Sequence, residues 1–319
     1  MKIRPQKFLR RLGKAAARWP HRWREWRQGL WPAWPGWMRP QPPHEYAGYA
    51  GPWMEQRMLA AWLKRRNEFP RWEYVPGFWT ELRIYHADAD WLAREAELRR
   101  LLEARITGGR RGFAVVQHDL GLPCALPTAV EVFGTSVGPH YIPLLKQPLP
   151  RERETREQPI PVSFVGRAKG DNDLNELRSR MLEAGKRLER FRCADGLDYA
   201  AYCDLLRQSV FTLAPRGYGP TSFRLYEAMA MRSIPVYIWE GECCLPFANE
   251  LDWDRLAVIV AAEELPRLGE ILAACGPERR AAIHAYTDEV YERSFTYNGV
   301  IDRVFDRLRR WEAGAAKGT

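Results

Sequence analysis

The sequence lacks the marks of a membrane-spanning or exported chain. Nowhere in its 319 residues do about 18 apolar residues without a charge follow one another, so no segment is expected to span a bilayer. The first residues also lack the apolar run of roughly 7–15 residues that a secretory signal contains. We therefore expect a cytoplasmic protein that lies peripherally on the inner face of the plasma membrane.

Patterns for disulfides and metal ions are missing as well. The six cysteines include no CxxC pair, and the adjacent Cys243 and Cys244 do not form a usual disulfide framework, so we expect reduced thiols. The six histidines form no HxxxH pair. Asp-x-Asp triplets occur at residues 88–90, 171–173 and 252–254, but the first two precede expected helices, where aspartate caps. We expect no metal and no other cofactor.

Excess positive charge is confined to the N-terminus. Residues 1–40 hold eleven of the 49 basic residues and one of the 40 acidic residues, so the net charge of +9 belongs to this segment. The arm, residues 1–44, also contains six tryptophans, among prolines that prevent one long helix. Because basic side chains attract anionic head groups and tryptophan suits the membrane–water boundary, we expect residues 1–40 to bind an anionic membrane surface.

Two other interpretations of the arm stay open. It can pack on the body of the protein or on a partner protein, and tryptophan can also stack on the bases of single-stranded nucleic acid. We expect no nucleic-acid partner, because the rest of the chain has 38 basic and 39 acidic residues and supplies no basic surface.

The remaining chain predicts two α/β domains, at residues 45–150 and 151–319. In the first we expect helices at 53–67 and 88–105 and strands at 72–76, 112–117 and 129–133. In the second we expect strands at 161–165, 190–193, 210–214, 234–239 and 257–260, and helices at 173–189, 197–207, 221–231, 263–274 and 278–310. This alternation implies parallel sheets covered by helices, with ligands beyond the carboxyl ends of the strands.

The segment 209–247 has the strongest pattern for a binding site. A buried strand is followed by a loop with Gly217 and Gly219, and a helix is expected to begin near Thr221 or Ser222. The free N–H groups and the positive dipole at such a helix start favour an anion.

Charged residues strengthen this interpretation. Arg216 in the loop and Arg224 in the first helical turn can each bind a diphosphate, and Glu227 one turn later can accept hydrogen bonds from a ribose diol. A structural interpretation remains open, in which Arg224 pairs with Glu227 and Thr221 or Ser222 only caps the helix.

These residues resemble the exostosin family of glycosyltransferases. The matching strings are Ser209-x-Phe211-x-Leu213-x-Pro215-Arg216-Gly217, Ser222-Phe223-Arg224-x3-Glu227-Ala228, Ile234-Pro235-Val236, Leu245-Pro246-Phe247 and Asp252-Trp253. Shorter strings agree in order: Tyr74-Val75-Pro76, Trp79-Thr80, His118-Asp119, Phe164-x-Gly166 with Arg178, and Tyr199 with Leu205-Leu206. The chain departs from the family in its short first domain and at Arg232-Ser233, where the family often has a small residue.

The resemblance implies the GT-B fold, in which two Rossmann-like domains with parallel sheets face a cleft. It also implies an inverting glycosyltransferase that uses a nucleoside-diphosphate sugar as co-substrate. The donor-binding residues that it implies are Gly166, Arg167, Arg178, Arg216, Gly217, Ser222, Arg224 and Glu227.

An inverting transfer requires a base for the proton of the acceptor hydroxyl. His118 and Asp119 follow an expected strand at its carboxyl end and are the candidate catalytic residues, although they can also pair with each other or cap a turn. Glu131 and Glu242 are further candidates. We expect the acceptor to be a growing, lipid-linked glycan of a bacterial surface. A catalytically silent GT-B partner subunit and a glycan-binding scaffold are the alternatives.

Overall fold

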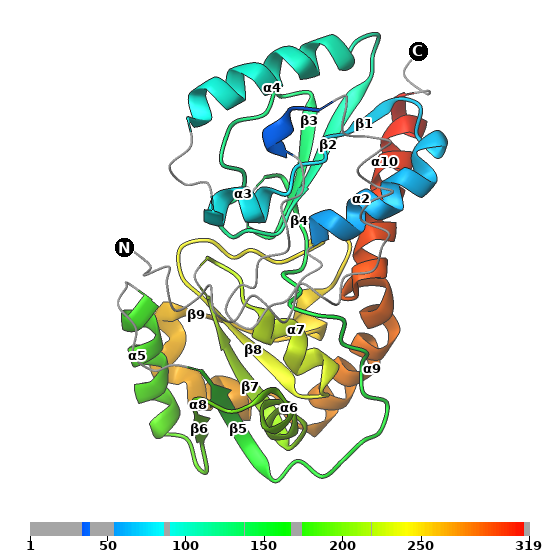
Figure 1. The fold of residues 1–319 in the computed structure, drawn as a ribbon. Coiled ribbons are helices and arrows are strands. Elements are labelled where there is room, and N and C mark those ends of the chain that lie inside the picture. Colours follow the sequence, from blue (N-terminus) through cyan, green and yellow to red (C-terminus); the bar gives the residue numbers. More distant parts are fainter. Residues whose placement is uncertain are drawn as a thin grey trace. The chain divides into compact units, whose positions relative to one another are not determined.

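The computed structural model describes residues 34–38, 54–85, 90–136, 138–166, 174–217 and 219–315 (Figure 1). The chain divides into two compact units, Met1–Phe133 with Ala315–Thr319 and Gly134–Gly314. The domain boundary that we predict, at residue 150, lies further along the chain, between the two sheets in sequence. In the described residues, no helix combines the length and the apolar character needed to cross a membrane.

The first sheet has the strand order β1-β2-β3-β4, and β1 and β2 run parallel. Its strands are β1 (Trp72–Tyr74), β2 (Arg111–Val116), β3 (Val130–Gly134) and β4 (His140–Tyr141). The helices of this part are η4 (Gly36–Met38), α2 (Met54–Arg65), η5 (Arg66–Glu68), α3 (Trp79–Tyr85) and α4 (Trp91–Arg105). Helix α4 begins where an aspartate cap was expected, because Asp90 accepts a hydrogen bond from the backbone N–H of Ala93 at 3.0 Å.

Helix α3 is not predicted by the sequence, because a distant residue satisfies one of the N–H groups in its first turn. The buried Glu55 Oε1 accepts hydrogen bonds from the N–H and the hydroxyl of Thr80, at 3.3 and 2.6 Å. The same oxygen accepts the N–H of Gln117 at 3.0 Å, so Glu55 connects the start of α2, the start of α3 and the end of β2. Burial raises the pKa of Glu55, although the hydrogen bonds from Gln117 and Thr80 oppose this effect.

The described part of the arm, residues 34–38, packs on α4. Trp34 is buried beneath the guanidinium of Arg105, whose carbon lies 4.5 Å from the ring centroid. Trp37 donates its indole N–H to Glu97 at 2.8 Å and contacts Trp91 edge-on at 5.9 Å. For these five residues, the alternative in which the arm packs on the body of the protein is therefore the one observed. The rest of the arm lies outside the described residues.

The second sheet has the order β6-β5-β7-β8-β9, and its neighbouring strands all pair in parallel. The strands are β5 (Ile160–Val165), β6 (Arg192–Ala194), β7 (Ser209–Pro215), β8 (Ile234–Trp239) and β9 (Val258–Ala261). The helices are α5 (Leu174–Lys186), α6 (Tyr199–Arg207), α7 (Phe223–Ala230), η6 (Trp253–Arg255), η7 (Ala262–Arg267), α8 (Leu268–Ala273), α9 (Pro277–Ser294) and α10 (Tyr297–Ala315). Helices α5 and α8 cover one face of this sheet, and α6 and α7 cover the other (Figure 1). The expected α/β class with parallel sheets is confirmed.

The apolar residues of the strands explain why helices cover both faces of this sheet. Val162, Phe164, Leu213, Val236 and Ile238 are buried in one hydrophobic cluster with residues of α5, η7 and α8. Strands that are apolar on both faces need helices on both faces, which the alternating sequence supplies.

The prediction of one continuous helix over 278–310 is wrong. Helix α9 ends at Ser294 and α10 begins at Tyr297. Between them, the buried Phe295 packs against three aromatic rings, and the hydroxyl of Thr296 accepts the N–H of Gly299 at 3.1 Å. This hydroxyl satisfies one of the free N–H groups at the start of the new helix.

Candidate functional site

The carboxyl ends of four parallel strands carry the residues of the candidate site. Gly166 follows β5, Asp195 follows β6, Arg216 follows β7 and Glu240 follows β8. Because neighbouring parallel strands end at the same edge of a sheet, these positions are brought together although they are far apart in sequence.

The loop between β7 and α7 is held by its own backbone and by β8. The N–H of Gly217 donates to the carbonyl oxygen of Thr221 at 2.8 Å, and the hydroxyl of Tyr237 donates to the carbonyl oxygen of Pro220 at 2.8 Å. A Cβ atom on Gly217 would lie 3.1 Å from the Thr221 oxygen, which explains the small residue. Ser222 caps α7 by accepting the N–H of Arg224 at 3.3 Å, so the expected cap is confirmed.

Two arginines and a glycine form a positively charged group beside β5. The guanidinium carbon of Arg224 lies 5.0 Å from the ring centroid of Phe164. Gly166 has a φ of +152°, a backbone conformation that favours glycine, and a Cβ atom there would lie 2.7 Å from Nη2 of Arg224, so a larger residue would displace this guanidinium. Burial, and then the charge of Arg224, lower the pKa of Arg178, which Asp195 opposes. A second guanidinium beside Arg224 suits a ligand that carries more than one negative charge.

Arg216 is placed at the same edge but has an acidic neighbour. Its Nη2 lies 3.7 Å from Oε2 of Glu240, and its N–H donates to the carbonyl oxygen of Ile238 at 3.0 Å. Glu240 also lies 3.3 Å from Arg180. The sequence interpretation missed Glu240. Its position directly after an expected strand is the signal that could have found it.

Glu227 is buried and only partly satisfied. Its Oε2 accepts a hydrogen bond from the hydroxyl of Tyr202 on α6 at 2.6 Å. Its Oε1 is buried and has no hydrogen-bond partner within the described ranges. No ion pair joins Arg224 and Glu227 in the described part of the chain, so the i,i+3 pair is not what holds these side chains. Tyr202 was not predicted, because nothing in its local sequence marks it.

His118 and Asp119 lie in the first unit, directly after β2. His118 Nδ1 accepts the N–H of Leu120 at 3.0 Å, and the His118 carbonyl oxygen accepts the N–H of Gly121 at 2.8 Å, so this pair of residues forms a turn. Burial, and then the charge of Arg83, lower the pKa of His118 to about 4. With Nδ1 accepting, the proton of the neutral imidazole lies on Nε2.

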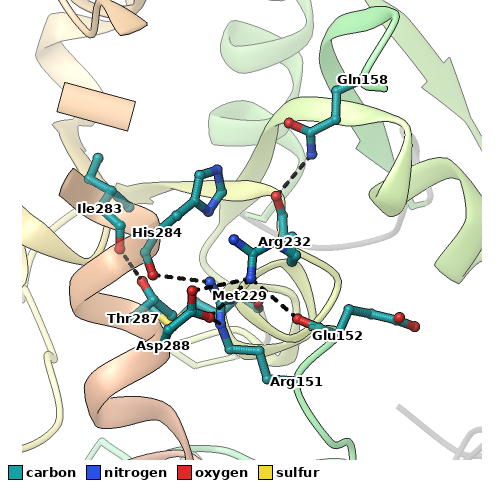
Figure 2. A network of polar contacts seen from close by, with 9 residues as sticks. All are labelled: Arg151, Glu152, Gln158, Met229, Arg232, Ile283, His284, Thr287 and Asp288. Carbon is teal, nitrogen blue, oxygen red and sulfur yellow. Dashed lines mark hydrogen bonds and ion pairs between the residues drawn. The ribbon is translucent and has the colours of Figure 1, made fainter. Parts of the chain in front are cut away.

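A second polar network lies at the other end of α7 (Figure 2). Arg151 donates to Asp288 of α9 and to the carbonyl oxygen of Met229, and Arg232 donates to both oxygens of Asp288 at 3.0 and 3.2 Å. Gln158 donates to the carbonyl oxygen of Arg232 at 2.9 Å. The network therefore fixes the segment before β5 against α7 and α9, which is a structural role.

Some predicted positions lie outside the described residues. These are Arg167, which we expect in the donor site, and the Asp-x-Asp residues 88 and 171–173. Within the ranges that are described, no three His, Cys, Asp or Glu side chains are placed to hold a metal ion.

The second unit is therefore Rossmann-like: a parallel sheet covered by helices, with guanidinium groups and a buried carboxylate at its carboxyl edge. The sequence of this unit identifies it further. Residues 128–275 match the model of the Exostosin GT47 domain, in agreement with the resemblance that the matching strings indicate.

Curated relatives share a short part of the chain. A probable glucuronosyltransferase of Oryza sativa subsp. japonica is 43% identical over 75 residues, which are 24% of this chain and 17% of the relative. A probable glycosyltransferase of Arabidopsis thaliana is 38% identical over 125 residues, 36% of this chain and 25% of the relative. A probable beta-1,4-xylosyltransferase of the same plant is 36% identical over 77 residues, 24% of this chain and 18% of the relative. The matches thus span about a quarter or less of these relatives.

Solved structures align loosely. WaaG, a glycosyltransferase involved in lipopolysaccharide biosynthesis, aligns with a TM-score of 0.36 and 10% identity over 78% of this chain and 81% of its own. AviGT4, a glycosyltransferase involved in avilamycin A biosynthesis, aligns with a TM-score of 0.37 and 15% identity over 82% of this chain and 90% of its own.

Proposed function

We propose that this protein is an inverting glycosyltransferase of the GT-B type, which moves a sugar from a nucleoside-diphosphate donor to a glycan. The exostosin GT47 domain and the relatives named for glycosyl transfer support this proposal. The observation that carries it is the buried, unsatisfied Oε1 of Glu227, one turn along α7 from Arg224, whose charge in turn acts on Arg178. A nucleotide supplies both a diol for the carboxylate and a diphosphate for the guanidinium groups.

The residues of the second unit act on the donor. The acceptor oxygen attacks the anomeric carbon as the bond from that carbon to the diphosphate breaks, and the nucleoside diphosphate leaves with the bonding electrons. Arg224, Arg178 and the N-terminus of α7 stabilise the charge that builds on the leaving group. Arg216 contributes less, because Glu240 already partly neutralises it.

The proton of the acceptor hydroxyl passes to a residue of the first unit. Between the two candidates we propose Asp119, because the hydrogen bond from Leu120 places the imidazole proton of His118 on the second ring nitrogen. His118 then acts as a hydrogen-bond donor to the acceptor. Asp119→Asn should therefore abolish transfer, whereas His118→Gln, which keeps a donor, should retain part of it.

Nucleotide binding by the full chain tests the donor site directly. Calorimetry and thermal unfolding are run with UDP, GDP, ADP and CDP, and then with the corresponding glucuronosyl and xylosyl nucleotides, since relatives are named for these sugars. We expect one nucleotide to bind the wild-type protein and Glu227→Gln to weaken this binding by about tenfold or more. Glu289→Gln, on the exposed surface of α9, is the control for loss of one carboxylate.

The outcomes separate the alternatives. Binding without turnover on any glycan would indicate a catalytically silent partner subunit. Glycan binding in the absence of nucleotide binding would indicate a scaffold, and the residues 216–227 would then serve the fold alone.

The proposal also includes the glycan acceptor and the place of the protein in the cell. We propose a lipid-linked glycan at the inner face of a bacterial membrane, with the basic, tryptophan-rich residues 1–33, the part of the arm before the segment that packs on α4, on anionic lipid. Flotation with vesicles of phosphatidylglycerol and phosphatidylcholine tests this. The full chain should float and a chain without residues 1–44 should not. Equal flotation of the two would overturn this part alone.

A further inference from the structure

Glu227 is held in one orientation by a residue of another helix. Tyr202 lies on α6, and its hydroxyl donates to Glu227 Oε2 at 2.6 Å, a short hydrogen bond to a charged acceptor. The other oxygen, Oε1, has no partner among the described residues although it is shielded from solvent. Glu227 itself is 8% exposed. A buried carboxylate oxygen without a donor is costly, so its orientation needs a fixed support and a ligand that supplies the missing donor.

The tyrosine can give this support at any physiological pH. Its phenol is half-buried and lies against the carboxylate, and loss of solvent followed by the charge of Glu227 raise its pKa well above the ordinary value of 10.0. The hydroxyl therefore keeps its proton and stays a donor. Helix α6 is itself fixed at its start, where Asp198 accepts the N–H of Ala201 at 2.9 Å.

We propose that Tyr202 is a positioning residue that directs Glu227 Oε1 toward the ribose hydroxyls of the donor nucleotide, and so makes the site selective for ribonucleotides over deoxyribonucleotides. The inference rests on the proposed donor site and adds a residue and a selectivity to it. A carboxylate oxygen accepts a hydroxyl proton but gains nothing from a C–H bond. A site built around such an oxygen rejects an analogue that lacks the hydroxyl, because its own polar group is then left unpaired.

The test compares each binding nucleoside diphosphate with its 2′-deoxy and 3′-deoxy analogues by calorimetry. Wild-type protein should bind at least one deoxy analogue about tenfold or more weakly than the ribonucleotide. Tyr202→Phe should weaken binding of the ribonucleotide by about tenfold and leave binding of the deoxy analogue nearly unchanged. The ratio of the two dissociation constants should therefore move toward one. A loss of general structure would weaken both ligands equally.

A matched control and a double-mutant cycle exclude a structural effect. Tyr297→Phe also removes a buried tyrosine hydroxyl of this unit, one that donates to the carbonyl oxygen of Leu145 at 3.0 Å, and it should leave the ratio unchanged. In a Glu227→Gln background, Tyr202→Phe should cause much less further loss than in the wild type, because the two residues act as one unit.

Three results would overturn the inference. Equal binding of ribo and deoxy nucleotides by the wild-type protein removes the selectivity, and an unchanged ratio in Tyr202→Phe removes the role of the tyrosine; the donor site survives both results. If no nucleoside diphosphate binds the wild-type protein, the donor site and the inference fall together.

Discussion

Arg232 allows a direct test of the backbone geometry at the end of α7. It has a φ of +59°, in the left-handed region that disfavours any residue with a Cβ atom, at a position where the exostosin family often has a small residue. This backbone strain is offset by two hydrogen bonds from the Arg232 side chain to Asp288, at 3.0 and 3.2 Å (Figure 2). Replacement by alanine removes the ion pair and keeps the strain, whereas glycine removes both.

The magnitudes follow from these contacts. Asp288 keeps its bond from Arg151 in either variant, so its charge is not left alone and the loss of the second arginine costs about 1–2 kcal/mol. The strain at a positive φ is worth about 1 kcal/mol. We therefore expect Arg232→Gly to be more stable than Arg232→Ala by about 1 kcal/mol, and to lie close to the wild type.

Urea unfolding at pH 7, followed by circular dichroism, measures the difference. Glu289, which is exposed in the middle of α9, is the control: there the alanine variant should be more stable than the glycine variant by about 1 kcal/mol. If alanine equals or exceeds glycine at position 232, the left-handed backbone at the end of α7 is refuted.

Three further predictions concern other parts of the chain. Burial lowers the pKa of His118 and His284 to about 4, below the ordinary 6.5, so the unfolded chain takes up their protons at a higher pH than the folded chain does. The free energy of unfolding should therefore be highest above about pH 6.5 and should decrease as the pH falls toward 4. Each histidine accounts for a loss of up to about 3 kcal/mol in the free energy of unfolding before solvent screening reduces it. A free energy of unfolding in urea that is the same at pH 7 and pH 5 would contradict this. Gly166→Ala should weaken nucleotide binding by about tenfold or more in calorimetry, because the new methyl group displaces Arg224; unchanged binding would exclude that contact. Trp34→Ala should destabilise the first unit by about 3 kcal/mol, and a variant as stable as the wild type would show that the arm does not pack there.

Local sequence predicted most elements of the fold. Apolar runs such as Ile234–Trp239 are typical of strands buried on both faces, and the alternation of strands with amphipathic helices predicts parallel pairing. Prediction from local sequence failed where the contact that determines an element comes from a residue far away in the sequence. In the first turn of helix α3, the N–H of Thr80 is satisfied by Glu55, 25 residues earlier, and the break at Phe295 depends on three aromatic rings that pack against it.

The candidate site divides in the same way. The sequence indicates Arg216, Arg224 and Glu227 by their place between a strand and a helix, and the family resemblance adds Gly166 and Arg178. It left open whether Arg224 pairs with Glu227 and whether His118 can act as a base. Tertiary contacts decided the first of these in the described residues, since Glu227 bonds to Tyr202. For His118, they show that Nδ1 accepts the N–H of Leu120, on which the proposed role of Asp119 rests.

The sequence by itself therefore determined the class of fold, the edge of the sheet at which the site lies, and the residues that carry its charge. These depend on periodicity and on residues within one strand–loop–helix unit, which act over short stretches of chain. Only the tertiary structure decided which oxygen of Glu227 stays unsatisfied, that Glu240 opposes Arg216, and that Arg224 lies against Phe164. Their partners come from separate strands and helices, and a hydrogen bond or ion pair forms only when the packed sheet brings both groups within about 3 to 4 Å.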